Sequence, residues 1–174
     1  MWVAEYSNNV NVRHPPGLVA KFTFPTEDGI HYLTSPANPG GKIIEANFGI
    51  IGTAPLNFVS VDRLTPPLKP NCSLYFQHKD DNMRTDGMRW WSLARVTLTL
   101  SVMLSLSIAL RPENWYTVYG GHGDMDQQHR NWFNGSKSNM GRWGITFGGD
   151  FPGHGVLETS GTAKFKLYSY HAHD

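Results

Sequence analysis

The sequence contains a single cysteine, Cys72, among its 174 residues. One cysteine cannot form a disulfide within the chain, so the fold depends on a hydrophobic core rather than on a disulfide framework. The 15 basic and 14 acidic residues nearly cancel and leave a formal net charge of +1. Without a strong positive field, we expect the chain to bind neither nucleic acid nor an anionic membrane surface.

Several familiar sequence signals are also missing. The first nine residues have neither a basic start nor an apolar run, so they do not resemble a signal peptide. We therefore expect a virion or cytoplasmic protein, or one whose leader has been removed. The longest leucine-rich stretch is interrupted by hydroxyl side chains and is too short for a membrane helix. There is no Gly-x-Ser-x-Gly, phosphate-loop or His-Glu-x-x-His pattern, and we expect no cofactor and no metal.

The most regular pattern is the run of residues 96–110, in which apolar and small side chains alternate. A helix would scatter its leucines around the axis, whereas a strand places them on one face. The run predicts a sheet with one apolar face and one polar face, as in packed antiparallel sheets. At about 50 Å it is too long for one strand, so we expect a bend or break near residues 102–104, with a bulge at Met103.

Eighteen glycines and eleven prolines favour many turns and few long helices. We expect an extended N-terminal arm over residues 1–17 and one β-sandwich domain over residues 18–174. The predicted fold is an all-β antiparallel sandwich, jelly-roll-like, with short helices over residues 112–119 and 126–133. Strands are expected over residues 18–24, 30–33, 42–51, 56–64, 73–78, 142–147 and 161–170.

Aromatic side chains are the first candidates for ligand binding. Trp90 and Trp91 are adjacent, so on a strand one points inward and the other outward. An exposed tryptophan or tyrosine offers a flat plate that stacks on sugar rings. Trp115 and Tyr119 add further aromatic surface in the second half of the chain. The alternative is that loops bury these rings, or that they serve a protein interface.

Glycine-rich loops supply the remaining candidates. His122 lies in a Gly-His-Gly-Asp turn, and Phe151 and His154 lie among five glycines of residues 144–156. Asp150 and His154 have the chemistry of an acid–base pair, but a crossover loop explains the same residues. His171 and His173 share a strand face. Because a structural zinc site takes four ligands, we interpret them as part of a C-terminal tail.

Six segments of the second half carry a resemblance to a known group. They are Arg89-Trp90-Trp91-Ser92, the alternating run, and residues 115–120, 144–149, 153–156 and 161–163. Over residues 74–167, roughly half the chain, the sequence resembles a little-characterised group of bacterial and phage-associated β-sandwich domains. The resemblance implies a shared fold, similar to that of carbohydrate-binding modules, and carries no established activity.

Taken together, the sequence favours a non-catalytic binding or assembly module, such as a phage virion structural or decoration protein that recognises a glycan. Its expected partners are other subunits of a larger assembly, including further copies of itself, and a glycan. The alternative is a polysaccharide lyase or glycoside hydrolase that uses His154, Asp150 or His122 as acid–base groups. The spacing of the carboxylates does not say whether two of them converge.

Overall fold

The computed structural model describes residues 3–6, 11–13, 20–26, 29–35, 40–61 and 69–174. These residues are mostly antiparallel strand, with one 3-10 turn, η1 (Pro112–Asn114), and one helix, α1 (Gln127–Ser138). The strands are β1 (Val3–Tyr6), β2 (Asn11–Arg13), β3 (Ala20–Thr23), β4 (Ile30–Ser35), β5 (Ile43–Ser60), β6 (Asn71–His78), β7 (Arg89–Thr97), β8 (Ser101–Ala109), β9 (Trp115–Thr117), β10 (Met140–Gly148) and β11 (Val156–His173). The all-β prediction is confirmed.

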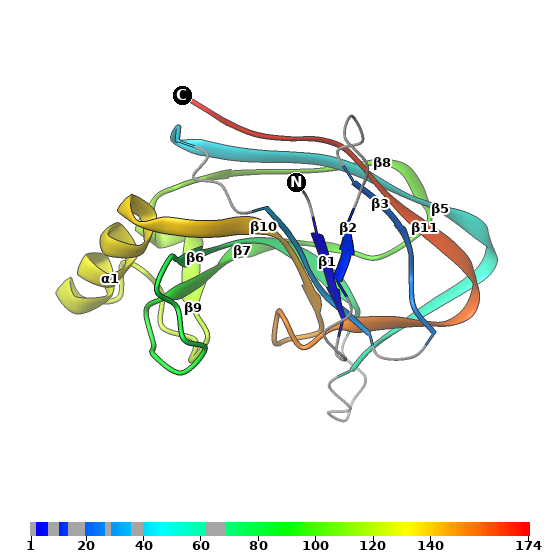
Figure 1. The fold of residues 1–174 in the computed structure, drawn as a ribbon, viewed down its shortest axis with the longest axis horizontal. Helices are drawn as coiled ribbons and strands as arrows, with labels where there is room; N and C mark the ends of the chain where they lie inside the picture. The colour runs from blue at the N-terminus through cyan, green and yellow to red at the C-terminus, as the bar shows by residue number, and fades with distance from the viewer. Residues whose placement is uncertain (1–2, 7–10, 14–19, 27–28, 36–39, 62–68) are drawn as a thin grey trace.

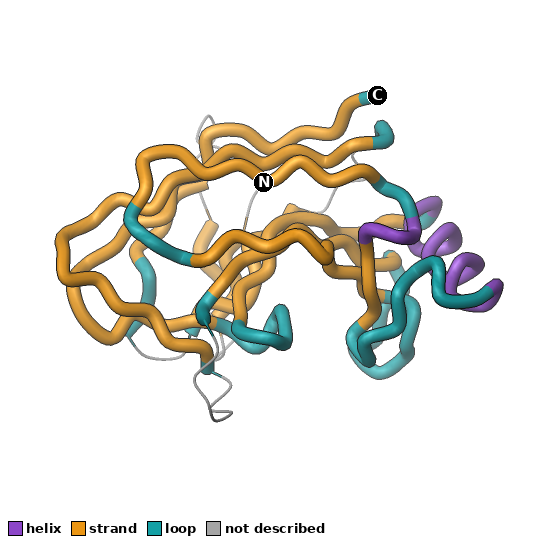
Figure 2. Tube along the Cα trace, turned by 180° about the vertical axis from the view of Figure 1, so that it is seen from behind, coloured by secondary structure: helices purple, strands orange, loops and turns teal. Residues whose placement is uncertain are grey.

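The strands form one curled sheet whose two halves face each other (Figures 1 and 2). The hydrogen-bonded order is β8-β5-β11-β4-β10-β6-β7-β9, with β3 on β11 and β1 on β4. We call β8, β5, β11 and β3 the first layer, and β4, β10, β6, β7 and β9 the second layer. The pair Val156 and Ile30 joins β11 to β4 where the sheet turns from one layer to the other. The jelly-roll-like connection of the strands stays a prediction.

The hydrophobic core lies between the two layers. Phe165 of the first layer meets Phe147 of the second edge-to-face, with ring centroids 5.6 Å apart. Helix α1 closes one end of this core, because its Phe133 is fully buried and contacts Phe76 and Trp90. The side chain of Asp126 caps this helix by accepting a hydrogen bond from the amide of His129 at 2.8 Å.

The alternating run divides between the two layers. β7 ends at Thr97, and after residues 98–100 the chain enters the other layer as β8, which pairs with β5. The break therefore falls earlier than the predicted 102–104. The predicted bulge is confirmed, because Phe48 pairs with Leu104 and Ile50 with Ser101, which leaves two residues of β8 opposite Gly49. Consequently Val102 is 76% exposed instead of facing the core.

The structure corrects three further predictions about the bounds and types of the elements. Residues 42–51 and the described part of 56–64 belong to one strand, β5. Residues 112–119 form η1 and then β9 instead of a helix, since the chain extends from Trp115 to pair with β7. The second helix begins as predicted and continues to Ser138. Within the expected N-terminal arm, β1 and β2 pair with each other and β1 pairs with β4, while the rest of the arm lies outside the described residues.

The last strand changes face in its middle. Ala163, Phe165 and Leu167 point into the core as predicted. A register shift between Leu167 and Ser169 then places two residues of β11 opposite one residue of β5. Such a bulge reverses the alternation, so Tyr170 packs against the core instead of sharing the outer face. The strand continues to His173, which corrects the prediction of a C-terminal tail.

Candidate functional site

The second layer has a face that points away from the core and carries aromatic and polar side chains. Alternation sends Leu33, Leu74 and Ile145 into the core and their neighbours to the other side. Cross-strand pairing then aligns these neighbours in rows across the layer. We call this surface the outer face; its residues are Tyr32, Thr34, Ser73, Tyr75, Trp91, Arg95, Tyr116 and Thr146.

Four rings form the floor of the outer face. Tyr32, Tyr75, Trp91 and Tyr116 make a second buried cluster, separate from the main core. The rings of Tyr32 and Tyr75 are 4.9 Å apart, and those of Trp91 and Tyr116 are 5.7 Å apart, both edge-to-face. A curled antiparallel sheet needs one apolar core, so an extra aromatic layer on the other face is a feature that the fold alone does not require.

Alternation along β7 puts Trp91 and Arg95 on this face, and a local irregularity between them sets Arg95 opposite Ser73. Tyr75 pairs with Trp91 and Ser73 pairs with Arg95, so β7 advances four residues while β6 advances two. Ser92 occupies the irregular stretch: its hydroxyl accepts a hydrogen bond from the amide of Leu74 at 3.0 Å and donates to the carbonyl of Ala94 at 2.8 Å. The serine of the Arg-Trp-Trp-Ser motif therefore has a structural role.

Arg95 connects the floor to the loop of residues 149–155. Its Nη2 donates to the hydroxyl of Tyr116 at 2.6 Å, and its Nη1 donates to the carbonyls of Gly149 and Asp150 at 3.3 and 3.2 Å. Burial raises the pKa of Tyr116 to about 12, so its phenol stays protonated at neutral pH. Because the oxygen accepts from Arg95, the phenolic proton points away from the guanidinium.

Arg89 lies across the other end of the floor. Its guanidinium carbon is 5.9 Å from the centroid of the Tyr32 ring, and its Nη2 forms an ion pair with Asp81 at 2.5 Å. Both side chains are nearly buried, at 10% and 2% exposure. The ion pair and the cation–π contact hold the guanidinium against the floor and give Arg89 a structural role.

Several buried polar atoms of this region have no hydrogen-bond partner among the described residues. They are Thr34 Oγ1, Ser73 Oγ, Arg89 Nε and Trp91 Nε1. Such atoms are rare in folded proteins, since a buried group without a partner costs about 1–3 kcal/mol. All of them belong to the second layer, and three lie on the outer face. Each of these atoms is covered by the protein, so a molecule bound on this face would not reach them in this conformation.

Two of the predicted ligand-binding residues are core residues instead. Trp90 and Trp115 have no exposed surface, and their indole nitrogens donate to the carbonyls of Gly87 and Ala109, both at 2.9 Å. Trp91 points to the opposite side from Trp90, as predicted, but it too is almost completely covered. The prediction that a tryptophan of this motif is an exposed plate is therefore wrong.

The other predicted residues lie on loops at the surface. The ring of Phe151 is 45% exposed and stacks on that of His154, with centroids 5.5 Å apart and planes tilted by 20°. Both belong to the loop that Arg95 holds. Tyr119 is 73% exposed in the turn after β9, the edge strand of the outer face. His122 is exposed in the same turn, and its backbone forms a bridge with Tyr116.

Sequence reasoning missed the floor residues Tyr32, Tyr75 and Tyr116, and Arg95 beside them. The signal for Tyr75 was present, because Ser73 and Tyr75 alternate with the apolar residues Cys72, Leu74 and Phe76. Alternation also puts Arg95 on the same face as Trp91, but its cross-strand partner Ser73 had no signal, since the irregularity in β7 decides that pairing.

The buried carboxylates of the described chain have structural partners. Glu158 is 3% exposed and accepts a hydrogen bond from the amide of Ala163 at 2.7 Å, and Asp81 pairs with Arg89. One set of metal-ligand side chains comes together in the described residues, namely Glu45, His171 and His173. It lies on the first layer and not on the outer face.

Comparison with known proteins found no matching family model, no matching curated protein and no matching solved structure. The resemblance to phage-associated β-sandwich domains therefore stays a prediction. Among the described residues, no helix combines the length and apolar character needed to cross a membrane.

Proposed function

We propose that this chain is a non-catalytic carbohydrate-binding module whose glycan lies on the outer face, beside the loop of residues 149–155. The observation that carries the proposal is the exposed ring of Phe151, which stacks on His154 at the border of the outer face, while the buried second cluster supports this border from below. Sugars offer both apolar C–H faces and many hydroxyl groups, and they bind where aromatic rings and hydrogen-bonding side chains alternate.

Three features of the outer face support a sugar as the ligand. Phe151 presents an exposed ring at the border of the face. Tyr116 and Arg95 offer a phenolic proton and a guanidinium beside it. His154 stacks on Phe151 and adds an imidazole ring at the same border. The near-zero net charge of +1 favours a neutral ligand over nucleic acid.

A glycan array followed by calorimetry with the oligosaccharides that bind tests the proposal. We expect saturable binding that Phe151→Ala weakens about fivefold or more, because the loss of an aromatic stacking contact of about 1 kcal/mol is a factor of about five. Tyr168→Ala is the matched control: Tyr168 is also an exposed ring, 40% accessible, but it lies on β11 of the first layer. The proposal fails if no glycan binds, or if both variants weaken binding equally.

The enzyme alternative is tested in the same samples. A lyase or hydrolase would release shorter products from any polysaccharide that binds, and His154→Ala would abolish that release. We expect no product from the unmodified protein. If products form and His154→Ala leaves their rate intact, His154 is not the catalyst.

We also propose that copies of this chain assemble through strand β8. Among the described strands, β8 ends the hydrogen-bonded order and pairs with β5 alone. Val102 and Met103, at its bulge, are 76% and 58% exposed. An edge strand with exposed apolar residues is a template for pairing with a second copy. The virion and phage assignments stay predictions.

Light scattering after size exclusion tests assembly. We expect a mass that is a multiple of 19.5 kDa, which Val102→Lys reduces to a single chain. Met83→Lys is the control, since Met83 is 68% exposed and lies in the loop before β7. A single-chain mass for the unmodified protein at all concentrations would exclude assembly through β8.

A further inference from the structure

Glu45, His171 and His173 meet on the solvent side of the first layer. β5 and β11 are antiparallel, and His171 pairs directly with Glu45. Residues two apart on a strand share a face, so His173 lies beside His171. The bulge of β11 after Leu167 decides that this face is the solvent side. Without the extra residue, both histidines would have pointed with Leu167 toward the core.

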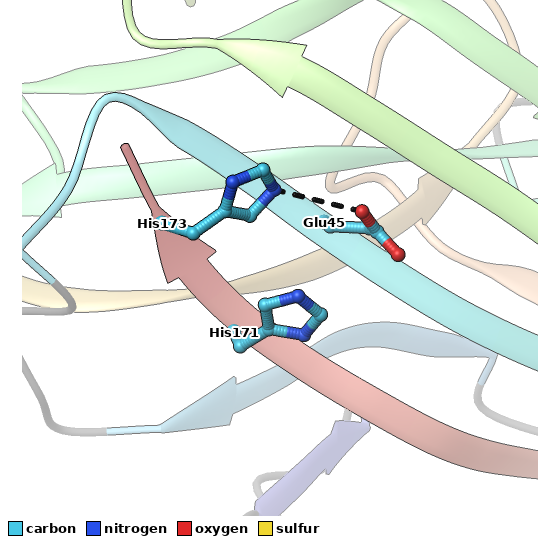
Figure 3. Close-up of side chains that lie close together, drawn as sticks. All are labelled: Glu45, His171 and His173. Atoms are coloured by element: carbon cyan, nitrogen blue, oxygen red, sulfur yellow. Dashed lines mark ion pairs between the residues drawn. The ribbon is translucent and has the colours of Figure 1, made fainter.

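The separations of the three side chains fit a shared ion. One ligand atom from each residue lies within 4.8 Å of the other two. His173 Nε2 is 3.6 Å from Glu45 Oε2, and Figure 3 shows the His171 ring beside the same carboxylate. Four ligands at about 2.0–2.1 Å from zinc are about 3.4 Å apart in a tetrahedron. Small side-chain rotations at this exposed position would bring all three into that geometry.

Neighbouring groups orient two of the three ligands. Asn47 Nδ2 donates to Glu45 Oε1 at 2.8 Å and also contacts the hydroxyl of Ser169 at 2.9 Å, which leaves Oε2 directed at His173. The pKa of Glu45 is lowered, mainly by this hydrogen bond and further by the two histidines, so the carboxylate is ionised. His173 Nδ1 lies 3.2 Å from the carbonyl of Asp174. Metal-binding histidines commonly direct one nitrogen to a carbonyl and the other to the metal.

The end of β11 is held in place by the turn before β5. The amide of Lys42 donates to the carbonyl of His173 at 2.9 Å, and Lys42 Nζ pairs with Asp174 at 3.7 Å. Gly41 has φ +71°, and a Cβ there would lie 2.8 Å from the amide nitrogen of His173. The close approach depends on glycine, and it keeps His173 paired with Ile43 up to the end of the strand.

From this geometry we infer that Glu45, His171 and His173 form a binding site for a divalent transition-metal ion, most simply zinc. Imidazole nitrogens and a carboxylate are suitable ligands for zinc, and three protein ligands leave the fourth position to solvent or to a ligand from outside. A bound ion would connect β5 to the last residues of β11. This inference is independent of the proposed glycan site, which lies on the other layer.

Isothermal titration with zinc chloride tests the site on the whole chain after treatment with EDTA. We expect one zinc ion per chain, and a rise in the thermal unfolding midpoint when zinc is present. His171→Ala, His173→Ala and Glu45→Gln should each weaken binding at least tenfold. Asn47→Ala should weaken it about tenfold, because outer groups that orient metal ligands have effects of that size.

His122→Ala is the matched control, because it removes an exposed histidine from the second layer and should leave zinc binding unchanged. All variants should keep the circular dichroism spectrum and unfolding midpoint of the unmodified protein in EDTA, since the altered side chains are exposed or half-buried. The inference is overturned if the unmodified protein shows no saturable zinc binding. It is equally overturned if His171→Ala and His173→Ala bind zinc as the unmodified chain does.

Discussion

Arg95 donates a hydrogen bond to the hydroxyl of Tyr116 at 2.6 Å and, through its other amino group, reaches the carbonyls of Gly149 and Asp150. One side chain therefore joins strand β7, strand β9 and the loop that carries Phe151 and His154. The position of the exposed Phe151 ring relative to the aromatic floor depends on this arginine.

Arg95→Ala should release the loop of residues 149–155. We expect a loss of about 1–2 kcal/mol in the free energy of unfolding by urea, because hydrogen bonds from a charged donor are removed. Amide hydrogen exchange should become faster in this loop and stay unchanged in β5. Arg95→Lys keeps the charge but not the planar fork, so it should show most of the same effect. An unchanged exchange rate in both variants would contradict the assigned role.

Trp90 and Trp91 provide a matched pair for measuring one hydrogen bond. Trp90 Nε1 donates to Gly87, whereas Trp91 Nε1 has no partner among the described residues. Replacing either tryptophan by phenylalanine removes a similar volume from a buried site, but only Trp90→Phe also removes a hydrogen bond. We therefore expect Trp90→Phe to cost about 1 kcal/mol more unfolding free energy than Trp91→Phe. Equal losses, or a larger loss for Trp91→Phe, would show that Trp91 Nε1 is bonded in solution.

Glu158 should stabilise the part of β11 in which the register against β5 shifts. Its Oε2 accepts from the amide of Ala163 at 2.7 Å in a buried position, where β11 shifts register against β5. Glu158→Ala leaves that amide without a partner, at an expected cost of about 1–3 kcal/mol in denaturant unfolding. Glu158→Gln keeps an acceptor oxygen and should cost less. The interpretation is wrong if the two variants are equally stable.

Cys72 should be unreactive in the folded protein and should give stability a pH dependence at high pH. Burial raises the pKa of its thiol above the ordinary 9.0, so the folded state keeps the proton while the unfolded chain loses it. The thiol therefore has little effect on the free energy of unfolding below pH 9. Above pH 9 this free energy falls as pH rises, and the thiol accounts for a loss of about 1.4 kcal/mol at pH 10.

Urea unfolding at pH 8 and pH 10 measures this effect. Cys72→Ala is less stable at both pH values because it leaves a small cavity, but it should lose less stability between them than the unmodified protein. Labelling by a thiol reagent should proceed only as fast as global unfolding. Rapid labelling of the native protein would show that Cys72 is accessible.

The local patterns of this chain determined its secondary structure class and most of its strands. Alternation in residues 163–167 and 104–110 correctly indicated core-facing side chains, because a regular strand has a fixed period of two. The same rule placed Trp90 and Trp91 on opposite faces. The single long run at 96–110 also required a break, because no ordinary strand reaches that length.

The tertiary structure decided where the period is broken. The bulges at β8 and β11 and the irregular stretch after Trp91 involve pairing with other strands. The two bulges reverse the alternation, and the irregular stretch shifts the cross-strand partners by two residues. For this reason Val102 is exposed, Arg95 lies opposite Ser73, and His171 points to solvent beside Glu45. Side-chain burial is likewise a property of the packed layers, which is why Trp90 and Trp115 are core residues although their sequence context resembled a binding motif.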